Sequence, residues 1–74
     1  MYILQRHSAD GYGEFTDVLG VSPDPAVLLY HGGKDGVVIE KQEGREYWVS
    51  PVMYDDHGHW WVTVQPVKVL SFST

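Results

Sequence analysis

Two of the four histidines lie in a short segment that also carries two aspartates, Asp55-Asp56-His57-Gly58-His59. On a continuous β-strand, Asp55, His57 and His59 would point to one face, where carboxylate and imidazole groups are suitable ligands for zinc or nickel. However, His57-Gly58 is also a turn sequence, and a turn removes the alternation on which that shared face depends. We therefore expect a polar hairpin loop without a metal or other cofactor. A metal-binding protein that uses His57 and His59 is kept as an alternative.

The sequence offers little for catalysis. His7, Ser8 and Asp10 have the side-chain types of a hydrolase triad, but triad members come from separate segments that a rigid scaffold brings together. Neighbouring residues of this kind are more typical of a turn. Asp55 and Asp56 are adjacent, so on a strand they would face opposite sides and make a poor acid and base pair. The chain has no cysteine. We expect a protein that is not an enzyme.

Aromatic residues are concentrated around two expected strands in the second half of the chain. Strand alternation places Tyr47 on one face and Trp48 on the other, and it separates Trp60 from Trp61 in the same way. One face of each strand must belong to the core. We expect the core face to carry Tyr47, Val49, Trp60, Val62 and Val64, which leaves Trp48 and Trp61 on the outer face.

An outward pair of tryptophans is typical of a binding surface, because a rigid indole buries a large area at low entropic cost. The alternative is that the two indoles cover a second small cluster under Phe72 or under residues 27–30. Exposed aromatic rings on a small barrel also stack on single-stranded nucleic acid, but such grooves carry basic residues, and only Lys41 and Arg45 are near. The predicted partner-binding residues are Trp48, Trp61, Glu46, Asp55 and Asp56.

Charge favours a basic partner. The chain has ten acidic and five basic residues, a net charge of −5, which makes binding to duplex nucleic acid unlikely because that binding needs clustered Lys and Arg. Residues 8–33 contain four acids and no Lys or Arg. Solubility alone would explain these acids; the sharper interpretation is an acidic face that docks on a basic protein or mimics nucleic-acid charge. The predicted secondary acidic face consists of Asp10, Glu14, Asp17 and Asp24.

The elements that must position these residues are short, since Gly and Pro occur at intervals that divide the chain into strand-length segments. We expect hairpin loops at residues 43–45 and 55–59, a turn at 8–11, and an interruption at 20–25. The expected strands cover residues 2–7, 37–42, 46–50, 52–54, 60–65 and 67–72, and residues 12–19 alternate imperfectly.

Residues 26–30, Ala-Val-Leu-Leu-Tyr, fit two elements. Ser22 would cap a helix that starts with Pro23 and stops at residues 31–33, and a buried strand has the same composition. Five residues are too few for periodicity to decide, and we favour the strand while allowing one short helix near residues 22–30.

The 74 residues are enough for one small globular domain that spans residues 1–74. We expect an all-β, mainly antiparallel fold of five to six strands, either a small SH3-like or OB-like barrel or a strongly bent sheet. No apolar run of membrane-spanning length and no signal peptide occur, so we expect a cytoplasmic protein without membrane contact. The predicted function is that of a non-catalytic, acidic protein-binding module, a stand-alone regulator or inhibitor of a larger host protein machine, of phage or mobile-element type. The sequence does not predict the oligomeric state.

Overall fold

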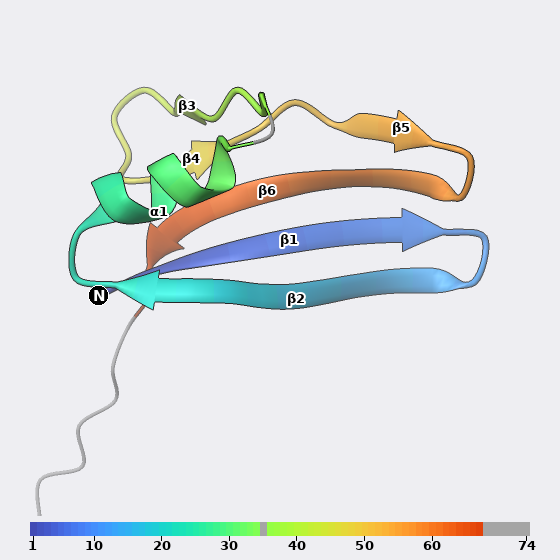
Figure 1. The fold of residues 1–74 in the computed structure, drawn as a ribbon, viewed down its shortest axis with the longest axis horizontal. Helices are drawn as coiled ribbons and strands as arrows, with labels where there is room; N and C mark the ends of the chain where they lie inside the picture. Colours follow the sequence, from blue (N-terminus) through green and yellow to red (C-terminus); the bar gives the residue numbers. More distant parts are fainter. Residues whose placement is uncertain (35, 68–74) are drawn as a thin grey trace, which may run out of the picture.

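A six-stranded, antiparallel sheet and one short helix make up the fold (Figure 1). The structure, a computed structural model, describes residues 1–34 and 36–67. The predicted fold class, mainly antiparallel β with one short helix, is confirmed. The elements are β1 (Tyr2–Asp10), β2 (Gly13–Ser22), α1 (Pro25–Gly32), β3 (Glu40–Lys41), β4 (Trp48–Val49), β5 (Met53–Asp55) and β6 (Gly58–Pro66).

The long strands β2, β1 and β6 lie side by side, with β1 in the middle (Figure 1). One edge of β6 pairs with β1 along its whole length. Its other edge is shared, because β5 pairs with its first residues and β4 pairs with Thr63 and Val64. β3 continues the sheet beyond β4, so β2 and β3 are the outermost strands of the path.

Two aspartates fix the hairpin turns at one end of the sheet. Asp10 Oδ1 accepts hydrogen bonds from the backbone N–H groups of Tyr12 and Gly13, at 2.7 and 3.1 Å. Asp55 Oδ1 accepts from His57 and Gly58 in the same way, at 2.8 and 2.9 Å. Such Asx turns replace the missing ladder bonds of the loop. The β5–β6 hairpin is therefore as predicted but tighter, and the first turn lies after Asp10 rather than at residues 8–11.

The predicted interruption at residues 20–25 was placed too early, because β2 runs on to Ser22. Its irregularity is a bulge: Gln5 pairs with Val18 and Leu4 pairs with Gly20, which leaves Leu19 as the extra residue. The bulge explains why the apolar alternation fails at the adjacent Val18 and Leu19.

Residues 26–30 are helical, so our preference for a strand was wrong. Asp24, not Ser22, caps the helix, and its Oδ1 accepts from the N–H of Ala26 at 3.0 Å. Pro25 is the first helical residue, a position where its fixed φ angle and missing N–H cost nothing. The N–H of Gly33 donates to the carbonyl of Leu29 at 3.0 Å and closes the last turn.

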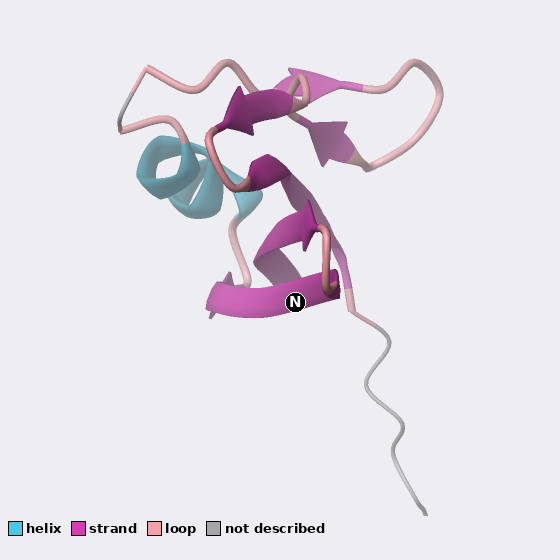
Figure 2. Ribbon diagram, turned by 90° about the vertical axis from the view of Figure 1, so that its right-hand side faces the viewer, coloured by secondary structure: helices cyan, strands magenta, loops and turns pink. Residues whose placement is uncertain are grey.

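The core lies between α1 and one face of the sheet, which we call the covered face (Figure 2). Leu28 of α1 packs there with Leu4, Val62 and Val64, and these four are the buried apolar side chains of the part of the chain that the structure describes. The partly buried residues around them are Tyr2, Leu29, Ile39, Trp48 and Trp60.

The predicted hairpin of residues 37–42 and 46–50 forms over a shorter length. Glu40 and Lys41 pair with Val49 and Trp48, and the N–H of Gln42 donates to the carbonyl of Tyr47 at 2.8 Å. The strand expected at residues 67–72 lies outside the described residues except for Val67, whose N–H donates to the carbonyl of Met1 at 2.9 Å. Within residues 1–34 and 36–67, no helix is long and apolar enough to cross a membrane.

Candidate functional site

A row of four aromatic rings lies on the sheet face opposite α1, which we call the open face. Trp61 stacks nearly parallel to His7, its cross-strand partner on β1, with 5.3 Å between ring centroids and 13° between planes. It stacks with His59 at 5.9 Å and 13°, and His59 contacts Tyr54 of β5 at 5.8 Å. This aromatic row, His7, Trp61, His59 and Tyr54, joins three neighbouring strands on one face.

Two threonines hold the His7 end of the row in place. His7 Nε2 and Thr63 Oγ1 share a hydrogen bond of 2.8 Å, and Thr16 Oγ1 lies 3.3 Å from His7 Nδ1. Thr63 is only 2 % exposed, so the imidazole covers its hydroxyl and satisfies it. Because both ring nitrogens have partners, the orientation of His7 is fixed, and the indole of Trp61 packs against a rigid ring.

The other end of the row borders a shallow hollow of about 350 Å³. Trp61, His59 and Tyr54 line it together with Val49, Ser50 and Val52. Tyr54 is 80 % exposed and Val52 is also exposed, whereas Trp61 is half-buried by its stacking partners. The hollow therefore presents apolar side chains and a phenol to solvent, features of a surface that binds another molecule.

The structure places Trp48 on the covered face, so the prediction that it shares a face with Trp61 was wrong. Trp48 pairs with Val64 and packs against the core, and Tyr2 contacts it edge-on with centroids 6.1 Å apart. Val49, which we had assigned to the core face, pairs with Thr63 on the open face instead. Trp60, Val62 and Trp61 lie on the faces that the alternation predicted.

The five predicted partner-binding residues do not form one patch. Glu46 lies beside the start of β1, where its Oε2 accepts a hydrogen bond from the phenol of Tyr2 at 2.9 Å. This bond, followed by burial and the negative charge of Glu46, raises the pKa of Tyr2. Asp55 and Asp56 lie in the β5–β6 turn region, opposite the far end of β1. A binding site at Trp61 therefore does not include Trp48 or Glu46.

The secondary acidic face is divided as well. Asp10 and Asp24 act locally, as turn and helix caps. Glu14 and Asp17 lie on the outer strand β2, where they pair in register with Ala9 and Arg6. Only these two members of the set share one strand.

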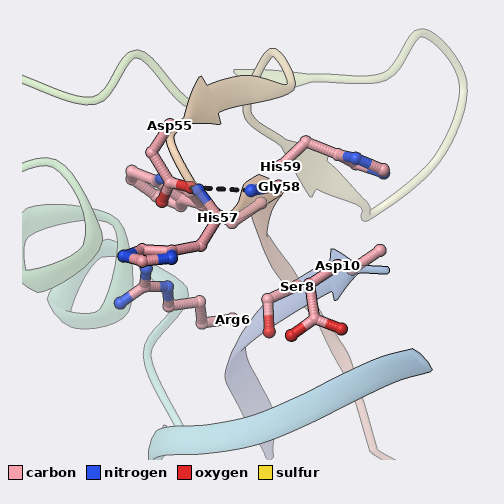
Figure 3. A pocket seen from close by; sticks show the side chains of 9 residues that line it. Arg6, Ser8, Asp10, Asp55, His57, Gly58 and His59 are labelled. Carbon is pink, nitrogen blue, oxygen red and sulfur yellow. Dashed lines mark hydrogen bonds between the residues drawn. The ribbon is translucent and has the colours of Figure 1, made fainter. Parts of the chain in front are cut away.

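A second hollow, of about 160 Å³, lies between β1 and the β5–β6 turn (Figure 3). Arg6 contributes its guanidinium, whose Cζ lies 4.6 Å from the centre of the Trp60 ring. The N–H of His57 bonded to Asp55 is the largest cause of a lowered pKa for that carboxyl, and the N–H of Gly58 and the charges of His57 and Arg6 act in the same direction. The hollow thus combines Arg6 and His57 with the carboxylates of Asp10 and Asp55, so neither charge dominates.

The two candidate metal ligands point apart. His57 belongs to the turn, while His59 points away from the other labelled side chains and joins the aromatic row (Figure 3). Among the described residues, no three His, Asp or Glu side chains are close enough to hold one metal ion. Because His57 lies in the turn and His59 in β6, the shared face that the metal-binding alternative requires does not form.

Sequence reasoning missed the contribution of His7, which it placed at the end of the expected strand 2–7 without a binding role. His59, Trp61 and Thr63 are alternate residues of β6, so strand alternation alone predicts that these three side chains share one face. The contribution of His7 depends on the pairing of β1 with β6, which joins residues 54 positions apart in sequence and has no local signal.

Comparison of the chain with protein-family models, with characterised proteins and with solved structures found no match.

Proposed function

We propose that this chain is a non-catalytic protein-binding module that docks through its open face. The observation that carries the proposal is the aromatic row with its adjoining hollow, on the side of the sheet that α1 leaves uncovered. A preordered row of rings loses little conformational entropy on binding, which is why rigid aromatic side chains dominate binding energies at protein interfaces. A regulator or inhibitor of a larger protein can act by docking through such a face, without catalysis.

Charge on this face supports a basic partner. The open-face positions of the strands include Glu14, opposite Ala9, and Glu40, opposite Val49. Arg6 and Lys41 pair with Val62 and Trp48 and so belong to the covered face. A protein surface with Lys or Arg around an apolar centre would therefore complement the open face.

The same distribution disfavours single-stranded nucleic acid, the alternative with exposed aromatic rings. Base stacking needs free ring faces beside basic groups that track the phosphates. The indole of Trp61 already stacks against His7 and His59, and the nearest charged strand residues on its face are acidic. A protein partner fits these observations better.

Affinity capture with matched variants tests the proposal. The immobilised protein, its Tyr54→Ser variant and its Tyr30→Ser variant are incubated with an extract of the native host, and the retained proteins are identified by mass spectrometry. Tyr54 and Tyr30 are both exposed tyrosines, at 80 % and 68 %, but only Tyr54 lies on the open face. A protein retained by the wild type and by Tyr30→Ser, but lost with Tyr54→Ser, supports the proposal. If every specifically retained protein is held equally by all three, the open face is not the docking surface.

A further inference from the structure

Within residues 1–34 and 36–67, the outer strand β2 is a long free edge. It spans ten residues, all of Gly13–Leu19 are exposed, and β1 is its one neighbour among the described strands. Its large apolar side chains are also open to solvent: Phe15 is 54 % exposed and Val18 is 60 % exposed, and Leu19 and Val21 are similar. A strand in this position presents unpaired backbone N–H and C=O groups to any extended chain that approaches it.

Natural proteins usually protect such an edge by short length, Lys or Pro within the strand, or a bulge. β2 is long and contains neither Lys nor Pro. It does have the bulge at Leu19, but this lies in its second half, and the pairing of Gly13–Val18 with β1 is regular. Six consecutive residues of the edge therefore keep the geometry that strand addition needs.

Charge indicates what would add there. Glu14 and Asp17 are the only charged residues of the strand, and they lie on its two different faces. The guanidinium of Arg6, which pairs in register with Asp17, lies over the Trp60 ring. Opposite charges at cross-strand positions stabilise a pair of strands, and like charges destabilise it.

We propose that the Gly13–Val18 edge of β2 binds an extended, basic segment of a partner protein as an added β-strand. Backbone hydrogen bonds give the affinity, and Glu14 and Asp17 select Lys or Arg at the facing positions of the segment. The site is separate from the open-face site, because it uses the edge of the sheet and not the aromatic row. A second copy of this chain fits less well, since pairing β2 with itself would gather four acids and no base along one short ribbon.

Synthetic peptides of nine residues provide the probe. The basic peptide has two Lys three positions apart in a background of Val and Thr, so that they lie on opposite faces like Glu14 and Asp17. The acidic peptide has Glu in place of each Lys, and a third peptide is the basic one with an N-methyl group on every peptide nitrogen. N-methylation keeps the charge but removes the N–H donors on both edges of the peptide. Binding is measured by isothermal titration calorimetry, and the contact is located by amide hydrogen exchange of the full chain.

We expect the basic peptide to bind at least about tenfold more tightly than the acidic one and to protect the amides of β2. The N-methylated peptide should lose this protection. The double variant Glu14→Lys with Asp17→Asn should lose the preference for the basic peptide, whereas Asp56→Lys, a charge change away from the edge, should keep it. Tyr54→Ser should also keep it, which separates this site from the open-face site.

Three results would overturn the inference. The first is equal binding of the basic and N-methylated peptides, because the attraction would then be charge alone. The second is a concentration-dependent dimer with protected β2 amides in the peptide-free protein, which would assign the edge to a second copy. The third is protection of β2 in the free chain that disappears when residues 68–74 are removed, which would assign the edge to this chain's own terminal residues.

Discussion

The indole of Trp61 and the imidazole of His7 stack across the β1–β6 pair, with centroids 5.3 Å apart and planes 13° apart. His7 also forms a hydrogen bond with the buried hydroxyl of Thr63, which lies on the same face of β6 as Trp61. The contact therefore links the open face to the interior of the sheet. A change at His7 alters the position of Trp61 as well as the packing over Thr63.

Truncating the two tryptophans separates their roles. Trp48 packs on the core, so we expect Trp48→Ala to lower the free energy of unfolding by roughly 3 kcal/mol, near the lower end of the range for large aromatic truncations. Trp61→Ala removes two aromatic stacks on the open face and should cost about 1–2 kcal/mol. Urea denaturation followed by circular dichroism measures both. A larger loss for Trp61→Ala than for Trp48→Ala would contradict the assignment of the two faces.

Gly13 and Gly58 test the close approach of β1 and β6. They follow equivalent Asx turns with similar φ angles, 150° and 156°. A Cβ at Gly58 would overlap the carbonyl oxygen of Ala9, whereas a Cβ at Gly13 meets no atom within 4 Å. We expect Gly58→Ala to destabilise the protein by about 2 kcal/mol more than Gly13→Ala, because backbone must shift to admit the methyl group. Thermal melts compare the two variants, and equal melting temperatures would contradict the close approach of the two strands at Ala9.

Ser50 makes the hydrogen bonds to β6 at the point where the strand neighbour of β6 changes from β4 to β5. Its Oγ accepts the backbone N–H of Val62 at 2.8 Å, and its own N–H donates to the carbonyl of Val62 at 2.9 Å. Ser50→Ala leaves the Val62 N–H without an acceptor, at a cost of about 1–3 kcal/mol. We also expect faster hydrogen exchange at the Val62 amide relative to Thr63. Unchanged exchange at Val62 would show that the hydroxyl is not its partner.

Asp55 gives the β5–β6 turn a pH dependence. Its pKa in the folded protein is lowered, chiefly by the N–H of His57, so the folded state favours the carboxylate. The resulting stabilisation is present above the ordinary Asp pKa of about 4 and is lost as pH falls through the lower folded value. Asn keeps an oxygen acceptor without the charge. We therefore expect the melting temperature of the wild type to exceed that of Asp55→Asn at neutral pH, and the difference to shrink below about pH 4. A difference that stays constant as the pH is lowered well below that value would contradict this role.

The hairpins were predictable because their signals are local. Asp55-Asp56-His57-Gly58 combines a turn-capping carboxylate with a glycine, and the apolar runs on both sides have the right length. The helix at Pro25–Gly32 was also signalled locally, by Asp24-Pro25 and by Gly32-Gly33, but the capping residue was sought at Ser22.

The face of Trp48 was not predictable, because alternation shows which residues share a face and not which face is the core. Each phase of the segment around Trp48 carries a large apolar side chain, Tyr47 and Val49 on one and Trp48 on the other. Because β4 has only two paired residues, its register with Val64 decides which phase faces the core. That register depends on contacts distant in sequence, as does the pairing that places His7 beside Trp61.

The most direct test of the open-face proposal is hydroxyl-radical footprinting of the chain, alone and in complex with the protein that affinity capture identifies. Side-chain oxidation reports the accessibility of each residue, so it distinguishes the two faces of one strand, which backbone exchange cannot do. We expect complex formation to reduce the oxidation of Tyr54 and Trp61 several-fold and to leave Tyr30 on α1 and Tyr12 in the β1–β2 turn unchanged. Unaltered oxidation of Tyr54 and Trp61, with protection of Tyr30 instead, would contradict docking through the open face.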